Sequence, residues 1–506
     1  MKPFVSWRDD ASTHLTLAHV VIGGALLFVA SNLLFVLNLR LLPGLIAGAG
    51  CLGAACVIVR AASQNAFLST RLHVRFFALC MVTGFGLNLL GGQGHIFYAT
   101  EDWLLRDAVL ADLSAMNLPA YGWKGETWLL RAPLGMYVLP GAIGRLAGLG
   151  AAHAMMLLQN ACLTGCALYL IADAFERRTR AFLEIVVLFS GLDCIGWLLF
   201  HSPAGLLFHT EGWNPLFQYS SFVTQIFWVP NHALPGWWFA ALLALHLRGG
   251  GLAPILLVFF AAALLWSPLA MMGALPFVLF VILREPRAML TPQVLWACVA
   301  GAAFLPVAIY LQADAAQVAH RWIVDLEIFP LCYVLFIGLE IPHTVFVAAH
   351  AFTQRRRWSG ALVLTIAMLL VIPFYWLGPG NDFAMRASIV PLAILSACFA
   401  TRALEFNDNK DPIRFVIWII IVLGAATPLT EITRNIRMKA YAISPCDLIS
   451  SWRERAASDA GNLDHYIVRA DHMPGWLLAA PQDRRPRLRE TESCWPDYPV
   501  PVIGGS

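Results

Sequence analysis

Long apolar runs recur along this chain at intervals that suit membrane-spanning helices. The hydrocarbon core of a bilayer is about 30 Å thick, so a helix needs roughly 20 apolar residues to cross it. Runs of this kind extend from Leu15 to Leu429. We predict about thirteen spans, at 15–39, 41–59, 73–92, 152–174, 182–200, 232–248, 251–266, 268–283, 293–312, 328–351, 359–377, 384–403 and 412–430.

One further apolar segment, 134–149, is too short to span the membrane by itself. The alternation of loops between the two sides closes only if 134–174 makes one net crossing. Helices that end inside the membrane are tolerated where they are buried in protein. We therefore expect 134–149 to be a re-entrant or half helix within the bundle.

Composition supports a membrane protein. Of the 506 residues, 59% are hydrophobic and 13% are charged. Soluble domains carry about 25% charged residues, so the excess of apolar residues indicates lipid-facing surface rather than a larger core. The net charge of +3 gives no reason to expect a nucleic-acid partner. The predicted fold class is an all-α polytopic transmembrane bundle.

Arginine-rich loops alternate with loops that carry few basic residues, and this assigns the loops to sides. Lys and Arg concentrate in loops that stay in the cytoplasm. The basic residues that mark such loops are Arg60, Arg71, Arg75, Arg177, Arg178, Arg180, Arg284, Arg287, Arg355, Arg356 and Arg357. The other large loops, at 93–133, 201–231, 313–327 and 378–383, are rich in aromatic residues, histidines and acids. We expect all four on the opposite, periplasmic or extracellular face.

Residues 431–506 follow the last span and form a second unit beside the predicted bundle of residues 1–430. The same count puts this tail outside, although basic residues directly after the last span favour the inside. Its mixture of charged and aromatic residues is typical of a small docked cap rather than a disordered segment. Cys446 and Cys494 could form one disulfide if the tail lies in an oxidising compartment.

The first outside loop contains a predicted amphipathic helix at 102–115, which we expect to lie at the membrane surface. In such a helix Asp102 and Arg106 share one face. A carboxylate at its start could act as a general base or hold a divalent cation such as Mg²⁺ or Mn²⁺. The alternative is that Glu101 and Asp102 only complement the helix dipole, with Thr100 as the cap.

Further along the same loop, aromatic residues alternate with charged ones, among them Trp123, Lys124 and Arg131. Sugar faces stack on aromatic rings, and phosphates pair with Lys or Arg. The same composition is typical of the interfacial aromatic belt of any polytopic protein. These three residues are candidate substrate-binding residues beside that alternative.

The second outside loop contains His209 and Glu211 and leads to Asn231 and His232, which open the next predicted span. Asn231 and His232 would lie at the membrane boundary, near the depth of a lipid-linked phosphate. A lone histidine there is more often a hydrogen-bonded structural residue. The cluster with His209 and Glu211 favours a substrate-binding role instead.

The third group is Asn381, Asp382 and Arg386, in a short loop and the helix that follows it. Asp382 and Arg386 are four positions apart and would share one face of that helix. An ionisable residue costs roughly 2.5–3.5 kcal/mol at the centre of a span, so we expect Arg386 to face the protein interior or a polar cavity. The two residues form either a structural ion pair or an anion-binding site.

These features resemble the GT-C superfamily of polytopic glycosyltransferases, which use polyprenyl-phosphate-linked sugars. The resemblance lies in the acidic loop with Glu101-Asp102 and in the Ala-Pro-Leu-Gly stretch at 132–135 that follows it. It covers residues 73–403 in arrangement. Two features depart from the family: two extra spans precede the acidic loop, and no His-Pro-Pro motif is present before the apolar stretch.

The resemblance implies that the loop acid is the catalytic base or binds a metal, and that cationic residues hold the lipid phosphate. By position, Asp102 is the first candidate for the base and Glu101 the second. Arg131 and Arg386 are candidate phosphate partners. No residue of the chain is assigned to a metal site of its own.

The function predicted from the sequence is a glycosyltransferase of the bacterial inner membrane. It would move a sugar from a polyprenyl-phosphate donor to a hydroxyl of a glycan or lipid acceptor on the periplasmic side, with inversion. One alternative is a transporter or flippase for a lipid-linked or small solute, and another is a polysaccharide polymerase or ligase. Transporters often contain repeats, broken helices and mid-membrane ionisable residues. Here the acids and histidines gather at one face, and no repeat is visible.

Overall fold

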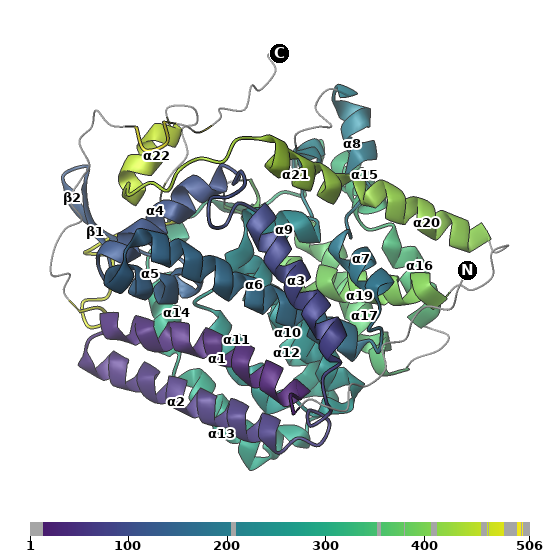
Figure 1. Ribbon diagram of the computed structural model, residues 1–506, viewed down its shortest axis with the longest axis horizontal. Helices are drawn as coiled ribbons and strands as arrows, with labels where there is room; N and C mark the ends of the chain where they lie inside the picture. The colour runs from purple at the N-terminus through teal and green to yellow at the C-terminus, as the bar shows by residue number, and fades with distance from the viewer. Residues whose placement is uncertain are drawn as a thin grey trace.

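The computed structural model describes residues 14–203, 209–351, 356–378, 380–405, 412–456, 463, 465–479, 493–496 and 498. Over these residues the chain is mostly helical (Figure 1). The all-α prediction is wrong in one detail, because the described residues also contain short strands: β1 (Ala120–Trp123), β2 (Glu126–Leu130), β3 (His320–Trp322), β4 (Tyr375–Leu377) and β5 (Ile467–Arg469).

Five helical segments among the described residues are long and apolar enough to cross a membrane. Some of them join two consecutive helices. They are α1 (Leu17–Phe35) with η1 (Val36–Asn38), α2 (Leu41–Ser63), α6 (Leu149–Ala174), α13 (Pro292–Ala302) with α14 (Leu305–Gln312), and α20 (Pro412–Gly424) with α21 (Ala426–Arg437). This finding agrees with the membrane class that the apolar runs predict.

The other predicted spans also fall on helices, but these helices are shorter or interrupted. They are α3 (Val74–Leu90), α7 (Arg180–Val187), α8 (Asp193–Phe200), α10 (Pro230–Leu245), α11 (Ala253–Ala263), α12 (Pro268–Arg284), α15 (Phe329–Glu340), α16 (His343–Ala351), α17 (Arg356–Val371), α18 (Asp382–Ala387) and α19 (Ile389–Glu405). Length and hydropathy therefore do not confirm the count of about thirteen crossings, which stays a prediction.

Several predicted spans are divided into two helices, and the interruptions of two of them meet. The first lies between α7 and α8, and the second lies between α15 and α16, where Pro342 has no N–H to continue the helical pattern. The backbone N–H of Leu192 donates to the carbonyl of Leu339 at 2.8 Å, which joins the two interruptions. Gly191 is required beside them, because a Cβ there would meet the backbone Cα of Glu340 at 2.8 Å.

The segment 134–149 forms the helix α5 (Gly135–Ala147), which packs against α6 after a break at Gly148. Gly148 has a φ of +89°, a conformation that favours glycine. A helix of this length reaches about 20 Å, which is less than a bilayer core of about 30 Å. The half helix expected from the sequence is therefore consistent with this structure.

Contacts gather the arginine-rich loops at one end of the bundle. Arg178 lies 2.7 Å from His73 and 2.6 Å from Asp173. Arg248 contacts the same Asp173 carboxylate at 2.8 Å. Three loops that are distant in the sequence therefore share this end, as the alternation of basic loops predicts.

The loops with few basic residues meet at the other end. β1 and β2 form a hairpin that β5 of the tail extends, and β3 pairs with β4. His472 of the tail lies 2.9 Å from Asp314, and Asn381 donates to the carbonyl of Leu216 at 3.0 Å. The hairpin turn at Lys124 and Gly125 has positive φ at both residues, which suits the right-handed twist of paired strands.

The described part of the tail packs against this end of the bundle. Its helix α22 (Leu448–Ala456) lies beside α4 (Asp102–Ala115), near β1 and β2 (Figure 1). The Leu448 N–H donates to Asp112 Oδ2 at 3.1 Å. Cys446 and Cys494 form a disulfide, which confirms that prediction.

The helix predicted at 102–115 is confirmed as α4, but its expected place at the surface is wrong. Every residue from Trp103 to Leu113 is buried. α4 packs against α5 and α6 on the bundle side, and α22 of the tail covers it from the other side. Asp112 on its polar face has a protein partner, the Tyr121 hydroxyl, which donates to the Asp112 carboxylate at 2.6 Å. A polar helix face is thus covered by protein rather than by water.

Candidate functional site

A group of polar side chains from distant segments meets at this end of the bundle, and we name it the central polar cluster. α4, α5, α10, α18 and the tail contribute its members. They are Asp102, Arg106, Tyr137, Asn231, His232, Asp382, Arg386 and Tyr466. Five of these residues were predicted as site residues from the sequence: Asp102 on α4, Asn231 and His232 on α10, and Asp382 and Arg386 on α18.

Arg106 joins three elements at the centre of this cluster. Its guanidinium donates to Asn231 Oδ1 at 2.7 Å and to the Tyr137 hydroxyl at 3.4 Å, and it lies 3.2 Å from Asp102 Oδ2. The side chain of Arg106 is only 4% exposed, whereas that of Asp102 is 27% exposed. Burial alone would lower the pKa of Arg106, but the neighbouring Tyr137 and Asp102 outweigh it and raise that pKa. Arg106 is therefore a permanently charged centre.

α4 is held in place by contacts near its first turn. The Trp103 indole N–H donates to the carbonyl of Phe227 at 2.6 Å, and the ring is fully buried. No side chain caps this end of α4, so Thr100 is not the cap that the alternative interpretation needed. Asp102 contacts Arg106 instead, as their spacing predicts, and Glu101 is exposed.

Asp382 and Arg386 form the ion pair expected from their spacing on α18. Burial raises the pKa of Asp382, Arg386 lowers it, and the Asp102 carboxylate raises it further, so that the net shift is upward. Asp102 and Asp382 are therefore close enough for their charges to interact. Gly378 permits this arrangement, because a Cβ there would meet Asp382 Oδ2 at 2.6 Å.

Asn381 and His232 both have partners that position helices. Asn381 has a φ of +59°, accepts a hydrogen bond from the Ala384 N–H, and so caps α18. His232 Nδ1 lies 2.7 Å from the hydroxyl of Ser267, which itself caps α12. His232 also lies within electrostatic range of Arg106. His232 is therefore hydrogen-bonded, as the structural interpretation expects, and it also lies in the central polar cluster.

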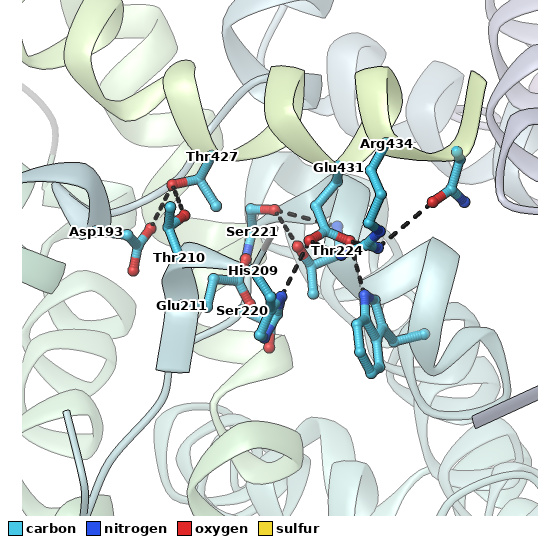
Figure 2. A network of polar contacts seen from close by, with 12 residues as sticks. Asp193, His209, Thr210, Glu211, Ser220, Ser221, Thr224, Thr427, Glu431 and Arg434 are labelled. Atoms are coloured by element: carbon cyan, nitrogen blue, oxygen red, sulfur yellow. Dashed lines mark hydrogen bonds and ion pairs between the residues drawn. The ribbon is translucent and has the colours of Figure 1, made fainter. Parts of the chain in front are cut away.

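His209 and Glu211 belong to a second polar network, which Figure 2 shows. His209 Nδ1 lies 3.0 Å from Glu431 Oε1, and Arg434 donates to the same oxygen at 2.9 Å. The indole N–H of Trp228 donates to Glu431 Oε2 at 2.7 Å. Glu431 is therefore bound from three directions, and α21 is tied by it to the segment after α8.

Glu211 has a pKa that burial raises first and the nearby Asp193 raises further, to about 7, while His209 opposes this shift. Its carboxyl group accepts the Ser221 N–H at 2.8 Å and the Gln218 amide at 2.9 Å. An acid whose pKa is raised in the folded state binds its proton more tightly there than in the unfolded chain. Stability contributed by this group therefore falls as the pH rises from 4.5 to about 7.

We expect the Tm of the solubilised protein to fall over this pH interval, and Glu211→Gln to remove part of the fall. Gln resembles the protonated acid at every pH, so the variant has no proton to lose. The measurement is thermal unfolding in detergent at several pH values. Glu184→Gln, at a side chain that is 51% exposed, is the control, and its Tm should fall with pH as steeply as that of the wild-type protein. An unchanged slope in Glu211→Gln would show that Glu211 does not titrate there.

Two more buried acids lie where the interrupted helices meet. Asp193 accepts from Ser190 Oγ at 2.7 Å and from Thr427 Oγ1 at 3.0 Å. Figure 2 shows the contact between Asp193 and Thr427. Glu340 accepts the indole N–H of Trp213 at 2.8 Å. Neither acid was among the residues predicted from the sequence. An acidic residue inside a predicted apolar span was the signal that could have found them.

The remaining predicted residues lie around the hairpin. Trp123 is buried, with its ring centroid 5.4 Å from that of Trp452 of the tail, while exposed Lys124 lies over the Trp123 ring. Arg131 is buried, and its backbone N–H donates to the carbonyl of Tyr466 at 2.7 Å. The aromatic residues at the hairpin thus help to bind the tail.

Among the described residues, neither Glu101 nor Asp102 belongs to a group of three metal-ligating side chains. The cation expected beside these acids stays a prediction. Tyr137 and Tyr466 were not candidates from the sequence, because nothing near them in the chain indicated a polar site. Comparisons with protein families, with curated proteins and with solved structures find no match for this chain.

Proposed function

We propose that this protein is a membrane glycosyltransferase that uses a polyprenyl-phosphate-linked sugar. The observation that carries the proposal is the central polar cluster, which brings two carboxylates and two arginines from α4 and α18 together. One acid and one phosphate-binding cation are the minimum for this reaction. The cluster lies at the end of the bundle where the predicted periplasmic loops gather, so we assign the reaction to that side of a bacterial inner membrane.

In the proposed reaction Asp102 takes the proton from an acceptor hydroxyl. The hydroxyl oxygen forms a bond to the anomeric carbon, and the bond from that carbon to the phosphate oxygen breaks. The electron pair of the broken bond stays on the polyprenyl phosphate, whose developing charge is stabilised by Arg386 and Arg106. A single displacement inverts the anomeric carbon.

Asp102 is preferred to Asp382 as the base. The Asp102 side chain is 27% exposed, against 18% for Asp382, so an acceptor reaches it more easily. Asp382 is joined to Arg386 within the same short helix, where it orients the guanidinium. This leaves Asp102 for proton transfer and Asp382 for positioning a phosphate partner.

Arg386→Gln is expected to weaken binding of a polyprenyl monophosphate that carries no sugar, raising Kd about 10- to 100-fold. The lost interaction is a charge-assisted contact in a mostly buried place, since the Arg386 side chain is 12% exposed. Native mass spectrometry of the purified protein with the lipid measures the change. Arg180→Gln, at a side chain 79% exposed near the other end of the bundle, is the control.

The double variant Asp382→Asn/Arg386→Gln separates phosphate binding from damage by an unpaired acid. If the double variant binds the lipid as weakly as Arg386→Gln, the arginine itself holds the phosphate. Recovered binding in the double variant, or wild-type binding in Arg386→Gln, would contradict the assigned role. Transfer is then tested with labelled polyprenyl-phosphate hexoses in liposomes. Products longer than one added sugar would favour the polymerase alternative.

One observation favours a transporter as the second candidate function. Asp193 and Glu340 are buried acids at the point where two interrupted helices meet, an arrangement that is common in transporters. A transporter would move a lipid-linked or small solute across proteoliposomes without transferring any sugar. Movement of a fluorescent polyprenyl-phosphate sugar that Asp193→Asn abolishes, with no glycosylated product, would favour this candidate.

A further inference from the structure

Three metal-ligating side chains meet beside the central polar cluster. His95 lies in the loop after α3, Asp107 on α4 and His153 on α6. One ligand atom from each lies within 4.8 Å of the other two. His95 Nε2 is 3.2 Å from Asp107 Oδ2, and His153 Nδ1 is 3.9 Å from Asp107 Oδ1. The side chains are 8%, 1% and 2% exposed, so water does not surround them.

Two of these side chains lack the hydrogen bonds that buried polar groups normally make. Both ring nitrogens of His153 and both carboxylate oxygens of Asp107 are buried without a well-aligned hydrogen-bond partner. Buried polar atoms in native proteins are nearly always hydrogen-bonded, and a buried carboxylate whose nearest charged neighbours are imidazoles at 3.2 and 3.9 Å is costly. A bound ion that coordinates both imidazole nitrogen and carboxylate oxygen would satisfy these atoms.

His95 is oriented as a metal ligand would be. Its Nδ1 lies 3.0 Å from the backbone carbonyl of Tyr441. A carbonyl only accepts, so Nδ1 carries the proton and Nε2 is the atom that faces Asp107. Metal-binding histidines usually donate their other ring N–H to a carbonyl or carboxylate in this way.

The loop that holds His95 adopts an unusual backbone conformation to place it. His95 has a φ of +58°, which is unfavourable for a residue with a side chain. Gly92 has a φ of +89°, and a Cβ there would meet the backbone nitrogen of Ala99 at 2.7 Å. Conformations of this kind gather at functional sites, where the surrounding structure enforces them.

We propose that His95, Asp107 and His153 bind one divalent transition-metal ion, with zinc as the expected metal. Magnesium and calcium prefer oxygen ligands alone, whereas imidazole suits zinc. Zinc bonds to nitrogen and oxygen are about 2.0–2.1 Å long, so two ligands in a tetrahedral site lie about 3.3 Å apart. The His95–Asp107 separation of 3.2 Å is close to this value, and the separation of 3.9 Å between His153 and the other Asp107 oxygen is longer, so a bound ion would draw His153 in.

The ion would hold α4 against α6 and the loop after α3, and through the Tyr441 carbonyl it would also hold the tail. α4 carries Asp102 and Arg106, so the metal supports the cluster without taking part in the proposed reaction. The proposal does not depend on sugar transfer, and it is tested by metal content and thermal stability alone.

The first experiment is elemental analysis of the full-length protein, purified through a tag that contains no histidines and without chelator. We expect about one zinc per chain. Removing the metal with EDTA should lower the Tm, and added zinc should restore it where added magnesium does not. Cobalt should bind the metal-free protein and give the visible absorption of a four-coordinate ion. Protein that holds no zinc and binds neither zinc nor cobalt at micromolar concentration would overturn the proposal.

The second experiment locates the ion. Asp107→Asn and His153→Ala should each lose the zinc, while His320→Ala, at an exposed histidine, should retain it. Full zinc content in both site variants would overturn the assignment. If a site variant does not fold, the cobalt spectrum and the EDTA response of the wild-type protein still decide the question.

Discussion

Replacing Asp102 with Asn is expected to reduce sugar transfer by about 10²- to 10⁴-fold, the usual contribution of a general base. The amide has the size of the carboxyl group and retains an oxygen that can accept from Arg106, which lies 3.2 Å from Asp102 in the wild-type protein. Folding should therefore be nearly unchanged while proton transfer is lost. The measurement is kcat for transfer of a labelled hexose from polyprenyl phosphate in liposomes.

Glu101→Gln is the matched control for this experiment. Glu101 precedes Asp102 directly, but its side chain is exposed, so the variant should transfer sugar at a near-normal rate. If Glu101→Gln is inactive and Asp102→Asn is active, then Glu101 is the base. Near-normal transfer by both variants would remove this pair of acids from the mechanism.

Replacing Arg106 with Met is expected to lower the free energy of unfolding by about 3–5 kcal/mol, because it breaks a buried ion pair and leaves its partners behind. Asn231 Oδ1 would lose its donor at 2.7 Å, and Asp102 would lose its counter-charge. Water reaches Asp102, which is 27% exposed, so we expect the lower end of this range. Thermal unfolding in detergent measures the change.

Two further variants show how much of this loss of stability comes from the buried ion pair. Arg180→Met removes an exposed arginine that pairs with Glu184, and we expect it to cost no more than about 0.5 kcal/mol. Adding Asp102→Asn to Arg106→Met should recover part of the loss, because the acid left unpaired is then neutral. An Arg106→Met protein as stable as Arg180→Met would show that the central polar cluster contributes little to the fold.

Features of the chain that depend on near neighbours were predictable from the sequence. The pairs Asp102–Arg106 and Asp382–Arg386 follow from the helical repeat, because residues four apart lie on one face. The helix at 102–115 follows from its apolar spacing in the same way. The membrane class follows from the length of the apolar runs, which no soluble core requires.

Other features depend on partners that a local pattern does not identify. The burial of α4 results from α22 and the tail covering its polar face. The hairpin gains its third strand from β5 in the same tail. The interruptions of the predicted spans at 182–200 and 328–351 meet, and the Leu192 N–H of one finds its acceptor in the Leu339 carbonyl of the other, a partner that lies far away in the sequence.

The length and spacing of residues along the sequence are enough to predict apolar helices that are long enough to cross a membrane, and acids and arginines that pair along single helices. Both features depend on residues within a few turns of one another. The proximity of Asp102 to Asp382, and the buried site that His95, Asp107 and His153 share, could be seen only in the folded chain. Contacts between distant segments depend on how whole helices pack, and packing follows from the shape of every surface involved.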